Sequence, residues 1–207
     1  MIAIIDYNAG NLRSVQRACR AVGMEATITA DPQDVESAER VLFPGVGAAP
    51  SAMETLSRTG LGEALRVAYK KGTPILGICL GTQIVLSHSE EGDVDCLGLF
   101  EGRVVRFRID DPMKKIPHMG WNGITVQQPH PLLEGVEEGD EFYFVHSYYP
   151  DGLAEENVYA VTDYDGPFCS ALGSGNLFAT QFHLEKSGRF GLAMLERFAT
   201  WDGMMPG

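Results

Sequence analysis

The residue best suited to chemistry in this sequence is a cysteine held between two glycines. Cys79 lies in the stretch GICLGTQ, with Gly77 and Gly81 on either side. The residues before it predict a short buried strand and those after it a helix, so Cys79 would occupy a sharp turn that holds its sulfur out of the sheet. The glycines would leave room for the tight backbone and a close-approaching substrate, and the helix N-terminus would favour the thiolate. A free cysteine is more often a small buried hydrophobe, but this pattern favours a nucleophile.

A base and a group to orient it occur together near the end of the chain, in TQFHLEKSG. His183 follows a predicted strand and Glu185 lies two residues on, so in extended geometry both side chains fall on one side. A carboxylate beside an imidazole fixes its tautomer and stabilises the imidazolium. Alone, a core histidine and a solvated glutamate are the commoner interpretations. Together with Cys79 they indicate a nucleophile, base and orienting acid.

The other histidines are weaker candidates. His146, in YFVHSYY, is the rival base, but Tyr148 rather than a carboxylate holds its next same-side position, so we interpret it as part of a binding wall. We place His130, in QPHPLL, in a proline-bounded surface turn, and His88 on the helix after Cys79, about two turns away and out of reach. The histidines and cysteines have no zinc-type spacing, so we expect no metal, and the sequence indicates no cofactor.

Acyl chemistry also needs donors for an oxyanion. The backbone N–H of Leu80, the first residue after the nucleophile, is one natural donor. The loop PGVG ends another predicted strand at the same edge of the sheet, where Val46 or Gly47 would present the second. The alternative is an ordinary glycine-rich turn.

Bulk properties exclude several classes of protein. The 207 residues suit one domain over 1–207, and 16 Lys plus Arg against 28 Asp plus Glu give a formal net charge of -12, which would repel a nucleic acid. No apolar run approaches the roughly 20 residues of a membrane span. The N-terminus lacks an export signal and the four cysteines are scattered, so we expect a cytoplasmic protein with reduced thiols.

The elements that must position these residues follow a βαβ rhythm. MIAIID is a predicted buried strand, a helix begins near Asn11 and stops at Gly23, and further strands are predicted in EATIT, RVLFPGVG and TPILGI, with a helix over residues 60–71. From about Gly98 the pattern changes to alternating, aromatic strands and one last helix, GRFGLAMLERFATW. We therefore predict an α/β fold with an open, mainly parallel central sheet, flanking helices and an antiparallel strand extension.

The motifs FPGVG, GICLGTQ and TQFHLEKSG, in this order, resemble the class I glutamine amidotransferases, in which a Cys-His-Glu triad on an α/β sheet releases ammonia from glutamine. Within that family, DYNAGNLRSV, PHMGWN and FVHSYY resemble the glutaminase subunits of imidazole glycerol phosphate synthases. The resemblance runs from Asp6 to about Gly191. Two positions depart from the family: Leu184 stands where proline is common, which would loosen the presentation of Glu185, and Thr82 stands where methionine or histidine is common, which would alter packing under the turn.

The resemblance implies roles for individual residues. Cys79 would attack the side-chain amide carbon of L-glutamine, His183 would protonate the leaving ammonia and then activate water, and Glu185 would orient His183. The oxyanion would be held at Leu80 and at Val46 or Gly47. The glutamine head group would be gripped by Gln83 and the backbone of Ser147 and Tyr148, with Glu91 a weaker candidate for the ammonium group.

The resemblance also implies a partner. The ammonia would pass to a separate TIM-barrel cyclase subunit in a heterodimer, which makes imidazole glycerol phosphate and AICAR in histidine biosynthesis. PHMGWN would be the docking and gating loop, with Trp121 as a buried aromatic anchor and Asn122 as a hydrogen-bonding contact. A structural loop with a core tryptophan is the alternative. The docking residues would be Pro117, His118, Met119, Gly120, Trp121 and Asn122.

Two other functions remain open at this point. A stand-alone hydrolase, such as a γ-glutamyl peptidase, shares the cysteine turn and the late histidine but would be fully active without a partner. A non-catalytic interaction module on this scaffold would be expected to lack Cys79, His183 or Glu185, and all three are present.

Overall fold

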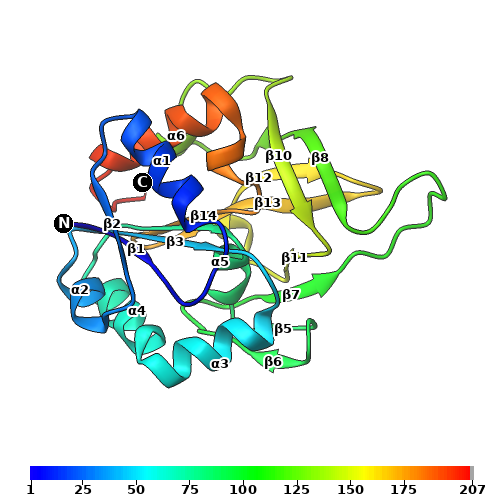
Figure 1. Cartoon of the computed structure of the whole chain (residues 1–207). Coiled ribbons are helices and arrows are strands. Elements are labelled where there is room, and N and C mark those ends of the chain that lie inside the picture. The colour runs from blue at the N-terminus through cyan, green and yellow to red at the C-terminus, as the bar shows by residue number, and fades with distance from the viewer. Residues whose placement is uncertain (206–207) are drawn as a thin grey trace.

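A computed structural model describes residues 1–205 and shows an open sheet covered by helices on both faces (Figure 1). The order of its eight strands is β2 (Ala26–Thr29), β1 (Ile2–Ile5), β3 (Arg40–Gly45), β4 (Ile75–Cys79), β14 (Leu177–Thr180), β13 (Pro167–Ser174), β12 (Val158–Asp163) and β9 (Thr125–Val126). The strands from β2 to β14 are parallel, and β13, β12 and β9 extend the sheet antiparallel. The predicted fold class is confirmed.

The parallel strands are apolar because helices cover both of their faces. Helices α1 (Leu12–Ala21) and α6 (Gly188–Thr200) lie on one face, and α2 (Pro32–Ser37), α3 (Ala49–Thr59) and α4 (Leu61–Lys70) lie on the other (Figure 1). The buried hydrophobic side chains form one cluster around the sheet. The single domain over residues 1–207 stays a prediction, and residues 206–207 lie outside the described part of the chain.

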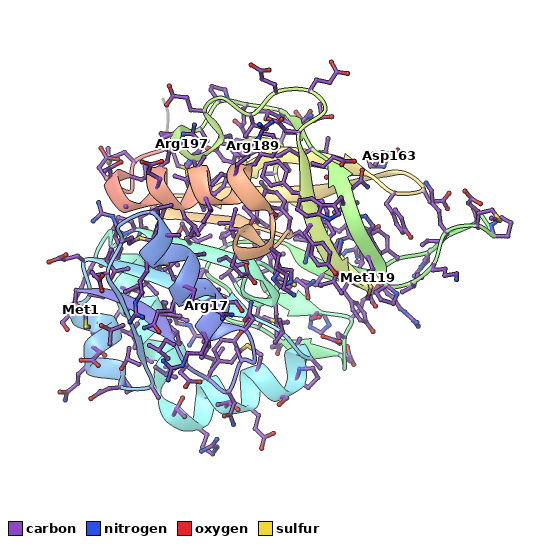
Figure 2. The ribbon with its side chains drawn as sticks, turned by 45° about the horizontal axis from the view of Figure 1, so that its top comes forward. Met1, Arg17, Met119, Asp163, Arg189 and Arg197 are labelled. Carbon is purple, nitrogen blue, oxygen red and sulfur yellow. The ribbon has the colours of Figure 1, made fainter. Side chains whose placement is uncertain are left out.

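Two smaller sheets flank the antiparallel end. One pairs β8 (His118–Gly123) with β10 (Glu141–His146), and the other has the order β11 (Tyr148–Asp151), β7 (Arg103–Arg106), β5 (His88–Ser89) and β6 (Val94–Asp95). The loop that joins β7 to β8 projects from the body (Figure 2). Short 3₁₀ turns occur at Pro131–Leu133, Glu155–Asn157 and Leu184–Lys186.

The register of the central strands decides where the candidate residues meet. Gly45 at the end of β3 lies opposite Cys79 at the end of β4, and Ile78 lies opposite Thr180 at the end of β14. The chain that follows each of these parallel strands therefore emerges at the same edge of the sheet. This edge brings the PGVG loop, Cys79 and the segment with His183 together.

Three local expectations were wrong. The helix after Cys79, α5 (Leu80–Ile84), ends after five residues, and His88 lies instead on β5, where the chain pairs with β6 and β7. His130 is only 4% exposed, because its ring stacks on Phe178 in the core. Residues 118–123 form a strand rather than a loop, since they pair with β10 over six residues.

No helix among residues 1–205 is long and apolar enough to cross a membrane.

Candidate active site

Cys79 ends β4 in a strained backbone conformation. Its φ of 56° and ψ of -105° are rare for any residue other than glycine, and such strain costs about 1–3 kcal/mol that the surrounding fold must offset. The side chain is 6% exposed and opens onto a cavity of about 350 Å³. The strand therefore ends in a turn that presents the sulfur to the cavity, as a nucleophile requires.

The flanking glycines are required for close packing between neighbouring elements. A Cβ on Gly77 would lie 2.8 Å from the Cβ of Ala179 on the neighbouring strand β14, and a Cβ on Gly81 would collide with the backbone oxygen of Phe43 on β3. Neither glycine has a positive φ; the strained residue of the turn is Cys79 itself. The two glycines let β4 and α5 lie tightly against β14 and β3.

His183 and Glu185 are joined by a hydrogen bond, though not in the extended geometry that we expected. β14 ends at Thr180, His183 precedes the 3₁₀ turn Leu184–Lys186, and Glu185 lies within that turn. His183 Nδ1 is nevertheless 2.8 Å from Glu185 Oε1, and both side chains are inaccessible to solvent. The turn curls the carboxylate back onto the imidazole, which leaves Nε2 for the cavity side.

Charge at the site favours a protonated His183. Burial by itself would lower the pKa of His183, but the adjacent Cys79 and Glu185 outweigh it and raise that pKa to about 10. Burial would raise the pKa of Glu185, yet its hydrogen bond and charge interaction with His183 bring the net shift downward. His183 Nε2 has no partner with full hydrogen-bond geometry, so its proton is available to a group in the cavity.

The sequence-based interpretation missed Asn11. Its side-chain amide donates a 2.7 Å hydrogen bond to Glu185 Oε1, although the two residues are 174 positions apart. Asn11 is the N-cap residue of α1, but its side chain makes no capping hydrogen bond. An asparagine before a helix reads as a cap, so no local signal distinguishes this one. The carboxylate that orients His183 is thus itself oriented from α1.

One cavity brings together almost all of the predicted site residues. It is lined by Val46, Gly47, Cys79, Leu80, Gln83, Glu91, Pro117, Val145, His146, Ser147, Tyr148 and His183. Glu185 is not part of the lining, because it lies behind His183. A larger cavity of about 620 Å³, bordered by α3, α4 and β6, contains none of these residues. Size alone would therefore have pointed to the wrong place.

The polar side chains of the cavity wall are held in defined orientations. Gln83 Nε2 donates to the Tyr148 carbonyl at 2.8 Å and to Gln181 Oε1 at 3.1 Å, while Gln181 Nε2 points at the Cys79 sulfur from 3.8 Å. Glu91 accepts a 2.8 Å hydrogen bond from the backbone N–H of Ala49, the first residue of α3. A neutral amide and a carboxylate thus line the same cavity as His183.

The two departures from the family pattern have visible consequences. The hydroxyl of Thr82 donates to the carbonyl of Thr180 and so joins α5 to the end of β14. Leu184 is fully buried, while the neighbouring Glu185 retains its hydrogen bonds to His183 and Asn11. Among residues 1–205, no three His, Cys, Asp or Glu side chains gather in a way that could hold a metal ion.

The residues expected at a partner interface divide between the two faces of β8. Trp121 is 53% exposed and Met119 is 62% exposed, so Trp121 is not a core residue of this chain. His118 is buried on the opposite face, and Pro117 lines the cavity. Trp121 packs edge-on against Tyr143 of β10, with ring centroids 5.9 Å apart. Figure 2 shows Met119 at the surface, close to where the projecting loop joins β8.

Comparison with known proteins agrees with this geometry. Residues 3–200 match the family model described as "Glutamine amidotransferase class-I". The chain is 46% identical to "Imidazole glycerol phosphate synthase subunit HisH" from Chromobacterium violaceum, covering 98% of each sequence. It is 48% identical to the protein of the same name from Nitratidesulfovibrio vulgaris, covering 96% of this chain and 95% of that one.

Solved structures share the fold at low sequence identity. The "Crystal structure of glutamine amidotransferase" is 17% identical with a TM-score of 0.76, covering 99% of this chain and 100% of that one. The "Structure of PurLQS from Thermotoga maritima" is 17% identical with a TM-score of 0.73, covering 96% of each.

Proposed function

This chain belongs to the class I glutamine amidotransferases, and from that premise we propose that it hydrolyses L-glutamine to glutamate and ammonia as the glutaminase subunit of an imidazole glycerol phosphate synthase. The observation that carries the proposal is the meeting of Cys79 and the His183–Glu185 pair at one cavity. Relatives that align with nearly the whole of this chain carry the name of a subunit of that synthase.

The reaction has two halves. The Cys79 thiolate attacks the side-chain amide carbon of glutamine, and His183 gives its proton to the leaving nitrogen, so that ammonia departs and a thioester remains. His183, now neutral, takes a proton from water as the water attacks the thioester, and Cys79 leaves as glutamate is released. Glu185 keeps the imidazole oriented and stabilises its cationic form throughout.

Both halves pass through an oxyanion. The backbone N–H of Leu80 and an N–H from the Val46–Gly47 segment are the donors we assign to it. Both segments line the cavity beside Cys79, which supports the assignment.

Gln83, the backbone of Ser147 and Tyr148, and Glu91 are the glutamine-binding groups in this proposal. Glu91 is the one carboxylate among the residues that line the cavity and is the natural partner for the substrate's ammonium group. Its hydrogen bond from Ala49 holds it in place.

The partner in this proposal is a TIM-barrel cyclase subunit, which forms a heterodimer with this chain and consumes the ammonia in making imidazole glycerol phosphate and AICAR. Ammonia in neutral water is mostly protonated and not nucleophilic, so a dry passage between the subunits is needed. The exposed Met119 and Trp121 on β8, close to Pro117 at the cavity, support docking by Pro117–Asn122. We place the activity in the cytoplasm, with neither nucleic acid nor membrane as a partner.

The test is ammonia release from glutamine by the purified chain, alone and with a cyclase subunit and its nucleotide ligand, with Cys79→Ala as the blank. We expect weak activity alone and strong stimulation by the partner that disappears in Cys79→Ala. Equal activity with and without the partner would favour a stand-alone hydrolase. Absence of activity in both would favour a binding module.

A further inference from the structure

Two buried histidines outside the Cys-His-Glu group lie side by side at the cavity: His146 lines it, and His118 contacts His146 but is not part of the lining. His118 of β8 and His146 of β10 are both almost inaccessible to solvent, and His118 Nδ1 lies 3.0 Å from His146 Nε2. Phe107, Phe144 and Phe168 surround the pair. A purely structural role in this aromatic cluster would need no hydrogen bonds between the rings.

The direction of the hydrogen bonds between these rings follows from their last acceptor. His146 Nδ1 lies 2.8 Å from the Tyr148 carbonyl, which can only accept, so the proton of His146 is on Nδ1. Burial lowers the pKa of His146 to about 3 and that of His118 to about 4, so both rings are neutral at pH 7. Neutral His146 therefore accepts at Nε2, and His118 donates to it from Nδ1.

The same reasoning extends the series of hydrogen bonds to Asn122. His118 has its single proton on Nδ1, which leaves Nε2 as an acceptor, and Asn122 Nδ2 lies 3.3 Å away. The amide orientation of Asn122 is set independently, since Nδ2 also donates to the Asp163 carbonyl at 3.0 Å and Oδ1 accepts from the Gly123 N–H at 2.9 Å. Every donor from Asn122 to Tyr148 thus points the same way.

This series of hydrogen bonds ends on the carbonyl oxygen of Tyr148, which also orients a side chain of the cavity. The Tyr148 carbonyl accepts from His146 and from Gln83 Nε2. Gln83 uses its amide nitrogen on Tyr148 and Gln181, so its oxygen is the atom left to face the cavity. A shift of the Tyr148 carbonyl would release the Gln83 amide and move the backbone beside it.

We propose that His118 and His146 are positioning residues, which as neutral rings donating in one direction hold the Tyr148 carbonyl and thereby the Gln83 amide that binds glutamine. The inference rests on the proposed function for the identity of the substrate. It also explains why His146, although close to the cavity, is not a second base: both of its ring nitrogens are occupied. Met119 and Trp121 lie on the outer face of β8 and His118 on its buried face, so the series of hydrogen bonds starts on the strand that carries the expected docking residues.

The first test does not depend on activity. In the full-length chain labelled with ¹⁵N, the ring nitrogen shifts of His118 and His146 should show neutral rings with the proton on Nδ1, the less common tautomer, down to about pH 5. Either ring in the Nε2-protonated tautomer, or either titrating near pH 6.5, would overturn the proposal. This result is independent of whether the protein hydrolyses glutamine.

The second test measures the role in binding, in the complex with the cyclase subunit and its nucleotide ligand. His146→Leu removes the donor to Tyr148, whereas His146→Asn keeps an N–H near the position of Nδ1. We expect His146→Leu to raise the KM for glutamine about tenfold or more, with kcat changed less than about threefold, and His146→Asn to recover most of the loss.

Controls separate positioning from folding. Melting temperature and the rate at which a small disulfide reagent modifies Cys79 should stay near the wild-type values in His146→Asn. An unchanged KM in folded His146→Leu, or a KM in His146→Asn as high as in His146→Leu, would overturn the proposal. If wild-type protein with its partner released no ammonia, the proposed function would fail instead, while the tautomer result would still stand.

Discussion

Asn11 and His183 donate to the same carboxylate oxygen, Oε1 of Glu185, from opposite ends of the chain. The 2.7 Å and 2.8 Å hydrogen bonds fix that oxygen from α1 and from the late histidine. Glu185 Oε2 is buried without a partner, so Oε1 alone holds the carboxylate in place. The N-cap residue of the N-terminal helix therefore helps to orient Glu185 and, in the proposed function, the base His183.

Asn11→Leu should lower kcat for glutamine about ten- to a hundredfold and leave the KM near its wild-type value. It removes a donor to a buried carboxylate, which costs about 1–3 kcal/mol, and Asn11 does not line the cavity. Asn11→Asp, of the same shape, should be worse because it places a second carboxylate against Glu185. Steady-state kinetics of the complex measure both; a raised KM with unchanged kcat would contradict the assignment.

Glu185→Gln should move the alkaline limit of activity to lower pH. The cationic form of His183 is present below its raised pKa of about 10 and is lost as the pH rises through that value. Glu185 contributes to that raised pKa, so removing its charge lowers the limit toward the ordinary histidine value of about 6.5. Ammonia release as a function of pH checks this, and an unshifted alkaline limb in a folded variant would refute it.

Cys79→Gly should melt at a higher temperature than Cys79→Ala. Both lack the nucleophile, but alanine retains the strain of a φ of 56° and glycine does not. A relief of about 1 kcal/mol corresponds to about 2–4 °C in a domain of this size. Thermal denaturation compares the two directly; equal or reversed melting temperatures would mean that the turn is not strained.

Gly81→Ala should destabilise the fold by about 1–3 kcal/mol, since its Cβ would collide with the backbone oxygen of Phe43 and separate α5 from β3. Gly123→Ala is the matched control: its added Cβ would come no closer than 3.9 Å to the Asp140 oxygen. Urea denaturation of both variants tests the difference. Equal stabilities would show that the turn after Cys79 accommodates the added methyl group without loss of stability.

Trp121→Ala should weaken the complex with the cyclase subunit about thirtyfold or more, as expected for an aromatic anchor, and leave the isolated chain's stability nearly unchanged because the side chain is exposed. Val126→Ala, which removes an exposed apolar side chain from β9 at the far edge of the main sheet, should have little effect. Titration calorimetry gives both affinities. If Trp121→Ala binds the cyclase subunit with wild-type affinity, the docking surface lies elsewhere on the molecule.

The sequence by itself determined the fold class and the residue types at the site. Apolar runs for the buried strands, with helical spacing between them, imply a mainly parallel sheet. Because the carboxyl ends of parallel strands lie at one edge of a sheet, Cys79, the PGVG loop and His183 are expected at that edge. The resemblance of the motifs to the class I glutamine amidotransferases indicated Gln83, Glu91, Ser147 and Tyr148 as binding residues, and all four line the cavity. These inferences rest on local periodicity and on short stretches of residues, which a sequence displays directly.

Only the tertiary structure decided which side chains meet. Asn11 looks like a helix cap until strand order brings Glu185 beside it, and His130 looks exposed until Phe178 covers it. The pairing of β8 with β10 turned an expected loop into a strand and placed His118 against His146. Hydrogen bonds across the fold depend on strand order, register and rotamer together, and none of these is contained in the spacing of residues along the chain.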